Sequence, residues 1–111
     1  MLPMNDTMNN TQNHMEEKQN YVYMLECSDG SYYTGWTTHL RERVQAHNNG
    51  NGAKYTRSRR PVHLVYFEIC PSRSDALKRE YAVKHLTRSE KEQMAGKAAE
   101  MVAAFDSREV G

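Results

Sequence analysis

Two tyrosines, an arginine and a glutamate stand in this chain in an order that suits phosphodiester hydrolysis. Tyr23 and Tyr33 lie ten residues apart in the aromatic runs YVY and YTG, and Arg43 follows ten residues later. Glu80 stands well downstream in the run KREYAVK. A phenol can relay a proton, a guanidinium can hold a phosphate, and a carboxylate can bind a divalent cation. These residue types together indicate hydrolysis of a phosphate ester with one bound metal.

The segment around the two tyrosines predicts a β-hairpin. The runs YVYMLE and SYYTGW are rich in strand-forming residues, and the turn between them contains the pair Asp29-Gly30. On two paired strands, Tyr23 and Tyr33 can point from the same face into one cleft. The alternative is that they only pack against cross-strand neighbours, as tyrosines of hairpins often do.

A helix, a basic loop and a third strand are predicted after the hairpin. Thr37 or Thr38 caps the helix, which runs to about His47 with Leu40 and Val44 on its buried side. The stretch NNGNG ends this helix, AKYTRSRRP forms the basic loop, and VHLVYFE alternates as the strand.

Two further helices are predicted toward the C-terminus. Ser72 or Ser74 starts the helix DALKREYAVKHL, and the run SEKE is a capping box for a third helix that carries Met94, Ala98 and Met101. About one residue per turn of the DALKREYAVKHL helix is expected to pack inward: Leu77, Tyr81 and either Val83 or Lys84. The order ββαβαα predicts a small α+β domain with a three-stranded, largely antiparallel sheet flanked by helices.

Each candidate residue also has an ordinary structural role. Arg43 and His47 lie one turn apart on the same predicted helix, where Arg43 is either a phosphate ligand or a surface arginine. His47 could accept a proton, contact the phosphate or cap the helix end as a cation. Glu80 could hold a Mg²⁺ that keeps most of its waters, or pair with Lys84 four residues on. Ionising a tyrosine at pH 7 costs about 4 kcal/mol, so a catalytic phenol needs cations beside it.

The net charge of +1 conceals a basic centre. From residue 31 to residue 91 the chain has twelve Lys and Arg against five Asp and Glu. Such a centre suits a polyanion, because Lys and Arg that face phosphates release counterions, although a solvated basic face is the alternative. The residues expected to contact nucleic acid are basic and lie in the loop and the later helices (Lys54, Arg57, Arg59, Arg60, Lys84 and Arg88).

Composition limits the remaining possibilities. The 111 residues suffice for one domain: a disordered polar tail over 1–20, a domain over 21–95, and a helix end and tail over 96–111. Met15, just before the first strand, is a candidate start position. No secretory signal or membrane-spanning run is visible, and Cys27 and Cys70 form no CxxC pair, which predicts reduced thiols in a cytoplasmic protein.

From Tyr21 to about Met94 the chain resembles the GIY-YIG nucleases. YVY stands for the first name motif and YTG for the second, with Tyr21 in place of a glycine and Thr34 in place of an isoleucine. GWTTHLRERVQAHNNG is similar to the arginine helix of the family, AKYTRSRRPVHLVYFE to its basic loop and third strand, and SDALKREYAVKHLTRSEK to its glutamate helix. The chain looks most similar to the small stand-alone bacterial members of the family. These members are related to the catalytic domain of the nuclease component of bacterial excinuclease and to nucleases that resolve DNA junctions.

The resemblance implies a role for each candidate residue. Tyr23 or Tyr33 would be the general base, and Arg43 would hold the phosphate. Glu80 would bind one Mg²⁺ or Mn²⁺, and His47 occupies a place where members carry His or Tyr. The function implied is metal-dependent endonucleolytic cleavage of DNA in repair or recombination. The alternative is a catalytically weak nucleic-acid-binding domain that acts with a partner protein.

Overall fold

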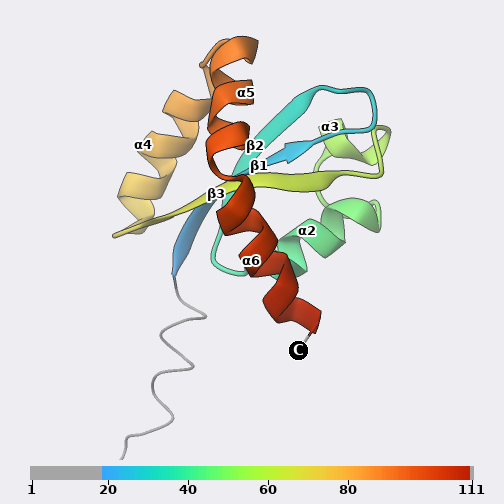
Figure 1. Cartoon of the computed structure of the whole chain (residues 1–111), viewed down its shortest axis with the longest axis horizontal. Helices are drawn as coiled ribbons and strands as arrows, with labels where there is room; N and C mark the ends of the chain where they lie inside the picture. Colours follow the sequence, from blue (N-terminus) through green and yellow to red (C-terminus); the bar gives the residue numbers. More distant parts are fainter. Residues whose placement is uncertain (1–18, 111) are drawn as a thin grey trace, which may run out of the picture.

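A three-stranded antiparallel sheet with strand order β2-β1-β3 forms the centre of the protein (Figure 1). The computed structural model describes residues 19–110, with side chains to 107, so the expected tail lies outside the described residues except for its last two positions. The strands are β1 (Asn20–Glu26), β2 (Tyr32–Thr37) and β3 (His63–Cys70). The helices are α2 (Leu40–Asn48), α3 (Lys54–Arg57), α4 (Arg73–Lys84), α5 (Arg88–Lys97) and α6 (Ala99–Val110). The α+β prediction is confirmed.

The hairpin forms as predicted. In the antiparallel register of β1 and β2, Tyr23 is opposite Gly35 and Leu25 is opposite Tyr33, which places both tyrosines on the same face of the sheet. Gly30 in the turn adopts a positive φ of 83°, which glycine tolerates without the steric cost of a side chain.

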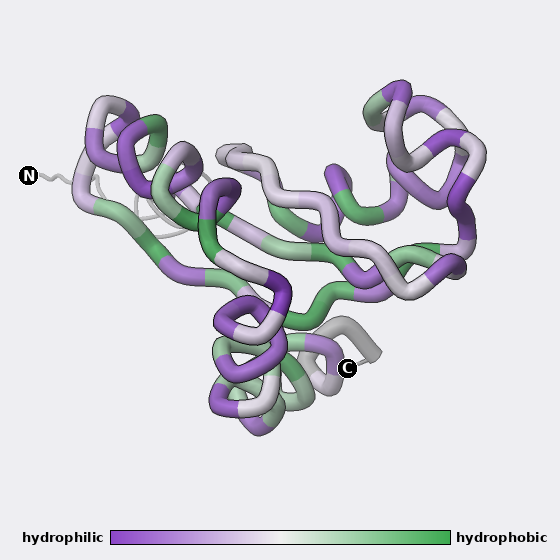
Figure 2. The backbone as a smooth tube through the Cα atoms, turned by 90° about the horizontal axis from the view of Figure 1, so that it is seen from above, coloured by the Kyte–Doolittle hydropathy of each residue, from purple (hydrophilic) through white to green (hydrophobic). Residues whose placement is uncertain are grey.

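Helices cover both faces of the sheet (Figure 1). Alternate residues of β1 point to opposite sides, so Val22 and Met24 pack against α4 while Tyr23 and Leu25 pack toward α2 and α6. Figure 2 shows hydrophobic residues along the strands and many hydrophilic ones on the helices. The buried residues therefore form one apolar cluster on each face of the sheet.

The buried side of α4 differs from the prediction. Leu77 is 42% exposed and Tyr81 is 67% exposed, so their expected inward packing was wrong, whereas Val83 is fully buried as expected. Ala76, one residue before Leu77, shares the buried stripe with Val83 because the two are seven residues apart, close to two helical turns. The small alanine lets the helix backbone approach β1 and β2 closely.

The C-terminal region forms two helices where one was expected. The chain turns at Ala98, whose buried side chain joins Val102 and Phe105 in the core. Residues 96–111, expected to be a helix end and tail, thus contain the twelve-residue α6, and two of its side chains complete the apolar cluster around Tyr23.

Two of the three predicted helix caps lie one or two residues from their expected positions. Helix α5 starts from a capping box of Thr87 and Glu90, not from Ser89 and Glu92. Both pairs match the same spacing pattern, which is why the sequence could not choose between them. Helix α4 is capped by Ser72, one of the two serines expected there. Helix α2 begins after His39, whose side chain makes no cap hydrogen bond, so the predicted cap at Thr37 or Thr38 was wrong.

The basic loop is also more ordered than predicted, since Lys54–Arg57 form the short helix α3. Cys27 and Cys70 are both buried and free, as expected of unpaired thiols. Within residues 19–110 no helix has the length and apolar character needed to cross a membrane.

Candidate functional site

The Tyr23 hydroxyl lies at the centre of the candidate site. The Tyr23 ring is 1% exposed and passes against Gly35 of the YTG run. A Cβ atom at position 35 would lie 2.7 Å from the Tyr23 hydroxyl oxygen, so only glycine leaves room for the ring at this point of β2. The hydroxyl oxygen is 2.8 Å from Nε2 of His47.

His47 connects Tyr23 with the basic loop. Its side chain is fully buried, and its second ring nitrogen, Nδ1, lies 2.7 Å from Oγ1 of Thr56 in α3. Burial, with a further contribution from the charge of Arg43, lowers the pKa of His47 to about 4. The imidazole is therefore neutral at pH 7.

Tyr33 borders the same space. Its ring centroid lies 6.5 Å from that of Tyr23 and 5.1 Å from that of His47. Tyr33 also stacks on Tyr55 of α3, with centroids 6.2 Å apart and an interplanar angle of 24°. The predicted convergence of the two tyrosines is thus observed, with His47 beside both.

Arg43 lies next to the Tyr23 hydroxyl. A hydrogen bond from Arg43 and its positive charge lower the pKa of Tyr23, but the larger effect of burial raises it to about 12. The negative charge of Glu80 adds to this rise, which places the carboxylate within electrostatic reach of the phenol. Tyr23 is therefore protonated at neutral pH unless further positive charge arrives.

Glu80 comes to the site from α4. Its side chain is 18% exposed, and one carboxylate oxygen lies 3.7 Å from Nζ of Lys84, so the helical ion pair considered above does form. Among the described residues no cluster of three or more His, Cys, Asp or Glu could hold a metal. A lone carboxylate fits a hard cation such as Mg²⁺, which keeps most of its waters and takes phosphate oxygens as further ligands.

Arg59, which was expected to contact nucleic acid, joins the basic loop to the hairpin turn. Its Nε donates to the carboxylate of Asp29 at 3.0 Å, its Nη1 donates to the carbonyl of Tyr55, and its guanidinium lies 3.9 Å from the centre of the Tyr55 ring. The backbone N–H of Ser28 also donates to the carbonyl of Arg59. These contacts hold α3 and Tyr55 against the hairpin that carries Tyr33.

The other basic residues divide into two groups. Arg60 and Arg88 bind main-chain carbonyls elsewhere in the protein, Arg60 on Asn48 and Arg88 on Gly30. The second group is exposed, and its side chains make no hydrogen bond to a main-chain carbonyl of a described residue (Lys54, Arg57 and Lys84). Contact of all six with nucleic acid stays a prediction.

Gly52, Thr56 and Asn48 were not identified as site residues from the sequence. A Cβ atom at Gly52 would lie 2.2 Å from Nδ1 of His47, so the glycine packs directly on the ring. Asn48 exchanges two hydrogen bonds with the backbone of Val62, which ties the end of α2 to the chain just before β3. The only sequence signal was the run HNNGNGAKYT, whose residues were interpreted as a helix end and a loop.

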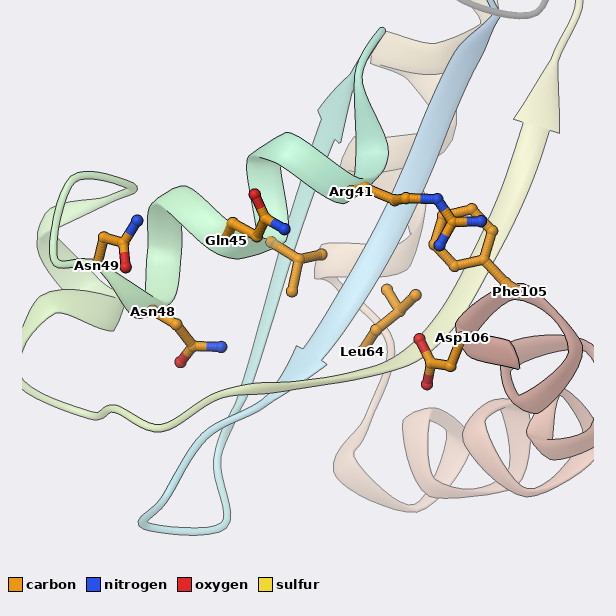
Figure 3. A pocket seen from close by; sticks show the side chains of 8 residues that line it. Arg41, Gln45, Asn48, Asn49, Leu64, Phe105 and Asp106 are labelled. Carbon is orange, nitrogen blue, oxygen red and sulfur yellow. The ribbon is translucent and has the colours of Figure 1, made fainter. Parts of the chain in front are cut away.

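A separate cavity of about 350 Å³ lies between α2, β3 and α6 (Figure 3). Arg41 reaches across it, with its guanidinium 3.9 Å from the centre of the Phe105 ring, and Leu64 and Asp106 line the opposite side. None of the predicted catalytic residues lines this cavity. The tyrosine site is therefore distinct from it.

Residues 19–93 match the family model of the GIY-YIG catalytic domain, and the chain belongs to this family of nucleases. The family acts on DNA and generally uses divalent metals. A UPF0213 protein of Clostridium perfringens is 59% identical over 75 residues, which cover 68% of this chain and 81% of that protein. A UPF0213 protein of Haloquadratum walsbyi is 57% identical over 75 residues, which cover 68% of this chain and 84% of that protein. The solution NMR structure of a UPF0213 protein from Bacillus halodurans has 51% identity and a TM-score of 0.46, covering 70% of this chain and 83% of its own.

The buried neutral His47 predicts a pH-dependent stability. Its folded pKa of about 4 lies below the unfolded value of 6.5, so between these values the unfolded chain binds a proton that the folded protein does not. The free energy of unfolding should therefore fall by roughly 3 kcal/mol as the pH decreases through this window, and be insensitive to His47 above it. Urea unfolding at pH 7.5, 5.5 and 4.5 measures this dependence.

His47→Gln is the control for this measurement, because glutamine does not titrate. Its free energy of unfolding should depend less on pH over the same window, and the difference between the two proteins isolates His47 from the carboxylates and the other histidines. Equal pH dependence in both proteins would contradict a depressed pKa for His47.

Proposed function

We propose that this protein is a metal-dependent endonuclease that hydrolyses DNA phosphodiester bonds. The observation that carries the proposal is the 2.8 Å hydrogen bond between the Tyr23 hydroxyl and a buried, neutral His47, with Arg43 beside the same hydroxyl. A phenol that is hydrogen-bonded to an unprotonated imidazole and lies next to a guanidinium suits one kind of catalysis. These are the groups that general-base activation of water beside a phosphate requires.

The proton path runs from water through Tyr23 to His47. The phenol oxygen accepts a proton from the attacking water while its own proton passes to Nε2 of His47, which is unprotonated at pH 7. The resulting hydroxide attacks phosphorus while the bond to the leaving oxygen breaks on the opposite side. That oxygen takes a proton from solvent water, and His47 afterwards returns its proton through Tyr23 to solvent. The phosphate is negatively charged, so its presence favours the imidazolium that forms. Tyr33 borders the same space and would hydrogen-bond to a phosphate oxygen or to the water.

Arg43 and Glu80 supply the charges for this reaction. Arg43 would donate to the scissile phosphate and offset the charge that develops on it. Glu80, with its low exposure, would hold a Mg²⁺ or Mn²⁺ ion through its carboxylate. When bound, such an ion supplies positive charge to the phosphate and the leaving oxygen.

The side chains of three exposed basic residues would contact DNA phosphates on either side of the scissile bond (Lys54, Arg57 and Lys84). They are exposed on α3 and α4, and α3 packs beside the site through Tyr55 and Thr56. Contacts of this kind go to phosphates, so they would not select a base sequence. DNA repair or recombination is the process in which such an activity would act.

Incubation of the full chain with supercoiled plasmid and with flap DNA tests the proposal. Cleavage should appear with Mg²⁺ or Mn²⁺ and disappear with EDTA. If DNA remains intact while binding falls steeply with salt, with a log–log slope of about −3 to −4 for about four phosphates, the protein is a binding module and the nuclease proposal is wrong. Cleavage that persists in EDTA would overturn the metal dependence.

A further inference from the structure

Thr56 reaches the candidate site from α3 through a hydrogen bond to His47. It is fully buried in α3, nine residues after His47, and its Oγ1 lies 2.7 Å from His47 Nδ1. We propose that Thr56 is a positioning residue that holds His47 in the Nδ1–H tautomer, so that the ring presents a bare Nε2 to Tyr23. The catalytic consequence rests on the proposed function, whereas the tautomer itself does not.

The hydrogen-bond partners of Thr56 indicate where the ring proton lies. The Thr56 hydroxyl has one proton to donate, and the carbonyl oxygen of Ala53, which can only accept, lies 3.1 Å from it. The N–H of Ala53 also approaches the Thr56 oxygen, at 3.3 Å. If the hydroxyl donates to the Ala53 carbonyl, the contact with His47 is a hydrogen bond only when Nδ1 carries the proton.

The surroundings of Tyr23 give the same answer independently. The hydroxyl contacts Arg43, whose guanidinium has donors and no acceptor, and Nε2 of His47. No other acceptor for the buried phenol proton is found among the described residues, so Tyr23 must donate to Nε2. The chain of donation therefore runs from Tyr23 to His47, from His47 to Thr56 and from Thr56 to Ala53.

The opposite tautomer, with the proton on Nε2, would disturb the hydrogen bonds of both Tyr23 and Thr56. Nε2–H would point at the phenol, leaving the Tyr23 proton without an acceptor, and Thr56 would turn its proton from the Ala53 carbonyl to Nδ1. The Ala53 carbonyl would keep its bond from the N–H of Arg57. The bonds of the ring to Tyr23 and Thr56 reverse direction, so the opposite tautomer has one hydrogen bond fewer, the bond from Thr56 to Ala53. Loss of one hydrogen bond shifts the tautomer ratio by roughly two- to tenfold, which favours Nδ1–H.

The tautomer matters for catalysis because an Nε2–H ring cannot take the proton of Tyr23. Gly52 packs against the same ring edge as Thr56, so the ring has no room to turn over and exchange its nitrogens. Thr56 thereby decides whether His47 is an acceptor, although it never contacts the substrate. This role for a residue of the basic loop is separate from any contact of that loop with DNA.

The test reads the tautomer directly by NMR of the full chain labelled with ¹⁵N-histidine, at pH 7.5. Wild-type His47 should show a protonated Nδ1 and an unprotonated Nε2. In Thr56→Val, which keeps the shape and removes the acceptor, the Nε2–H fraction should rise at least about fivefold, whereas Thr56→Ser should keep the wild-type pattern. Thr34→Val is the matched control, because Thr34 is buried and its hydroxyl makes no hydrogen bond with any described residue.

Cleavage rates then test the consequence. Thr56→Val should lower kcat by roughly tenfold or more with little change in KM, while Thr56→Ser and Thr34→Val should stay within about threefold of wild type. A wild-type His47 in the Nε2–H form, or a Thr56→Val protein with an unchanged tautomer, would overturn the proposal. If Thr56→Val does not fold, the wild-type and Thr56→Ser spectra still decide. A wild-type protein without cleavage would overturn the proposed function and leave the tautomer result readable.

Discussion

Arg43→Ala and Glu80→Ala should each lower metal-dependent DNA cleavage by roughly a hundredfold or more while leaving the protein folded. The hydrogen bond and positive charge of Arg43 lower the pKa of the Tyr23 hydroxyl, and the negative charge of Glu80 raises it. Loss of the guanidinium removes the offset for charge on the phosphate, and loss of the carboxylate removes the proposed metal ligand. Initial rates on plasmid DNA, with thermal unfolding of each variant, measure both effects.

Two comparison variants separate catalysis from loss of charge. Glu92→Ala removes a helix-surface carboxylate that pairs with Arg88 four residues before it, in the way that Glu80 pairs with Lys84, but lies on α5 and should retain wild-type cleavage. Arg43→Lys keeps the charge and loses the fork of donors, so its rate should fall between those of wild type and Arg43→Ala. Wild-type cleavage by Glu80→Ala would rule out the one-metal mechanism. Unfolding of both alanine variants would mean that the two residues are structural.

The sequence predicted the hairpin well because its signals are local. Asp29-Gly30 between two strand-forming runs specifies the turn, and the register that follows puts Tyr23 and Tyr33 on one face. That they converge with Arg43 could be anticipated only through the resemblance to a nuclease family, because spacing along the chain does not specify how α2 lies on the sheet.

The errors arose where tertiary packing decides between similar residues. On α4 the large apolar residues Leu77 and Tyr81 were expected inside, but a helix that lies close on a sheet buries the smaller Ala76. Similarly, Arg59 and Thr56 were interpreted by residue type, as a basic side chain and a loop residue. Their partners, Asp29 and His47, lie on other elements, so only the folded chain reveals the contacts.

Gly52→Ala should destabilise the protein by about 2–4 kcal/mol, because a core with no room for another methyl group must shift to admit it. The added Cβ would lie 2.2 Å from Nδ1 of His47 and 2.7 Å from its Cα, and a backbone atom cannot move aside as a flexible side chain can. The φ angle of Gly52 is not in the left-handed region, in contrast to the 86° of Gly50, so the expected loss comes from contact with His47 rather than from backbone strain. Thermal and urea unfolding measure it.

Gly96→Ala is the matched control, since it makes the same chemical change where there is space. Gly96 lies within α5 and nothing lies within 4 Å of a Cβ added there, so alanine should raise the free energy of unfolding by about 0.5–1 kcal/mol through its better helix propensity. The two variants should thus move stability in opposite directions. The Gly52 variant should also lose cleavage, because the displaced His47 ring no longer meets Tyr23 and Thr56, whereas the Gly96 variant should cleave normally. A Gly52→Ala protein as stable and active as Gly96→Ala would contradict the packing of Gly52 on His47. It would also contradict the chain of hydrogen bonds from Tyr23 through His47 to Thr56.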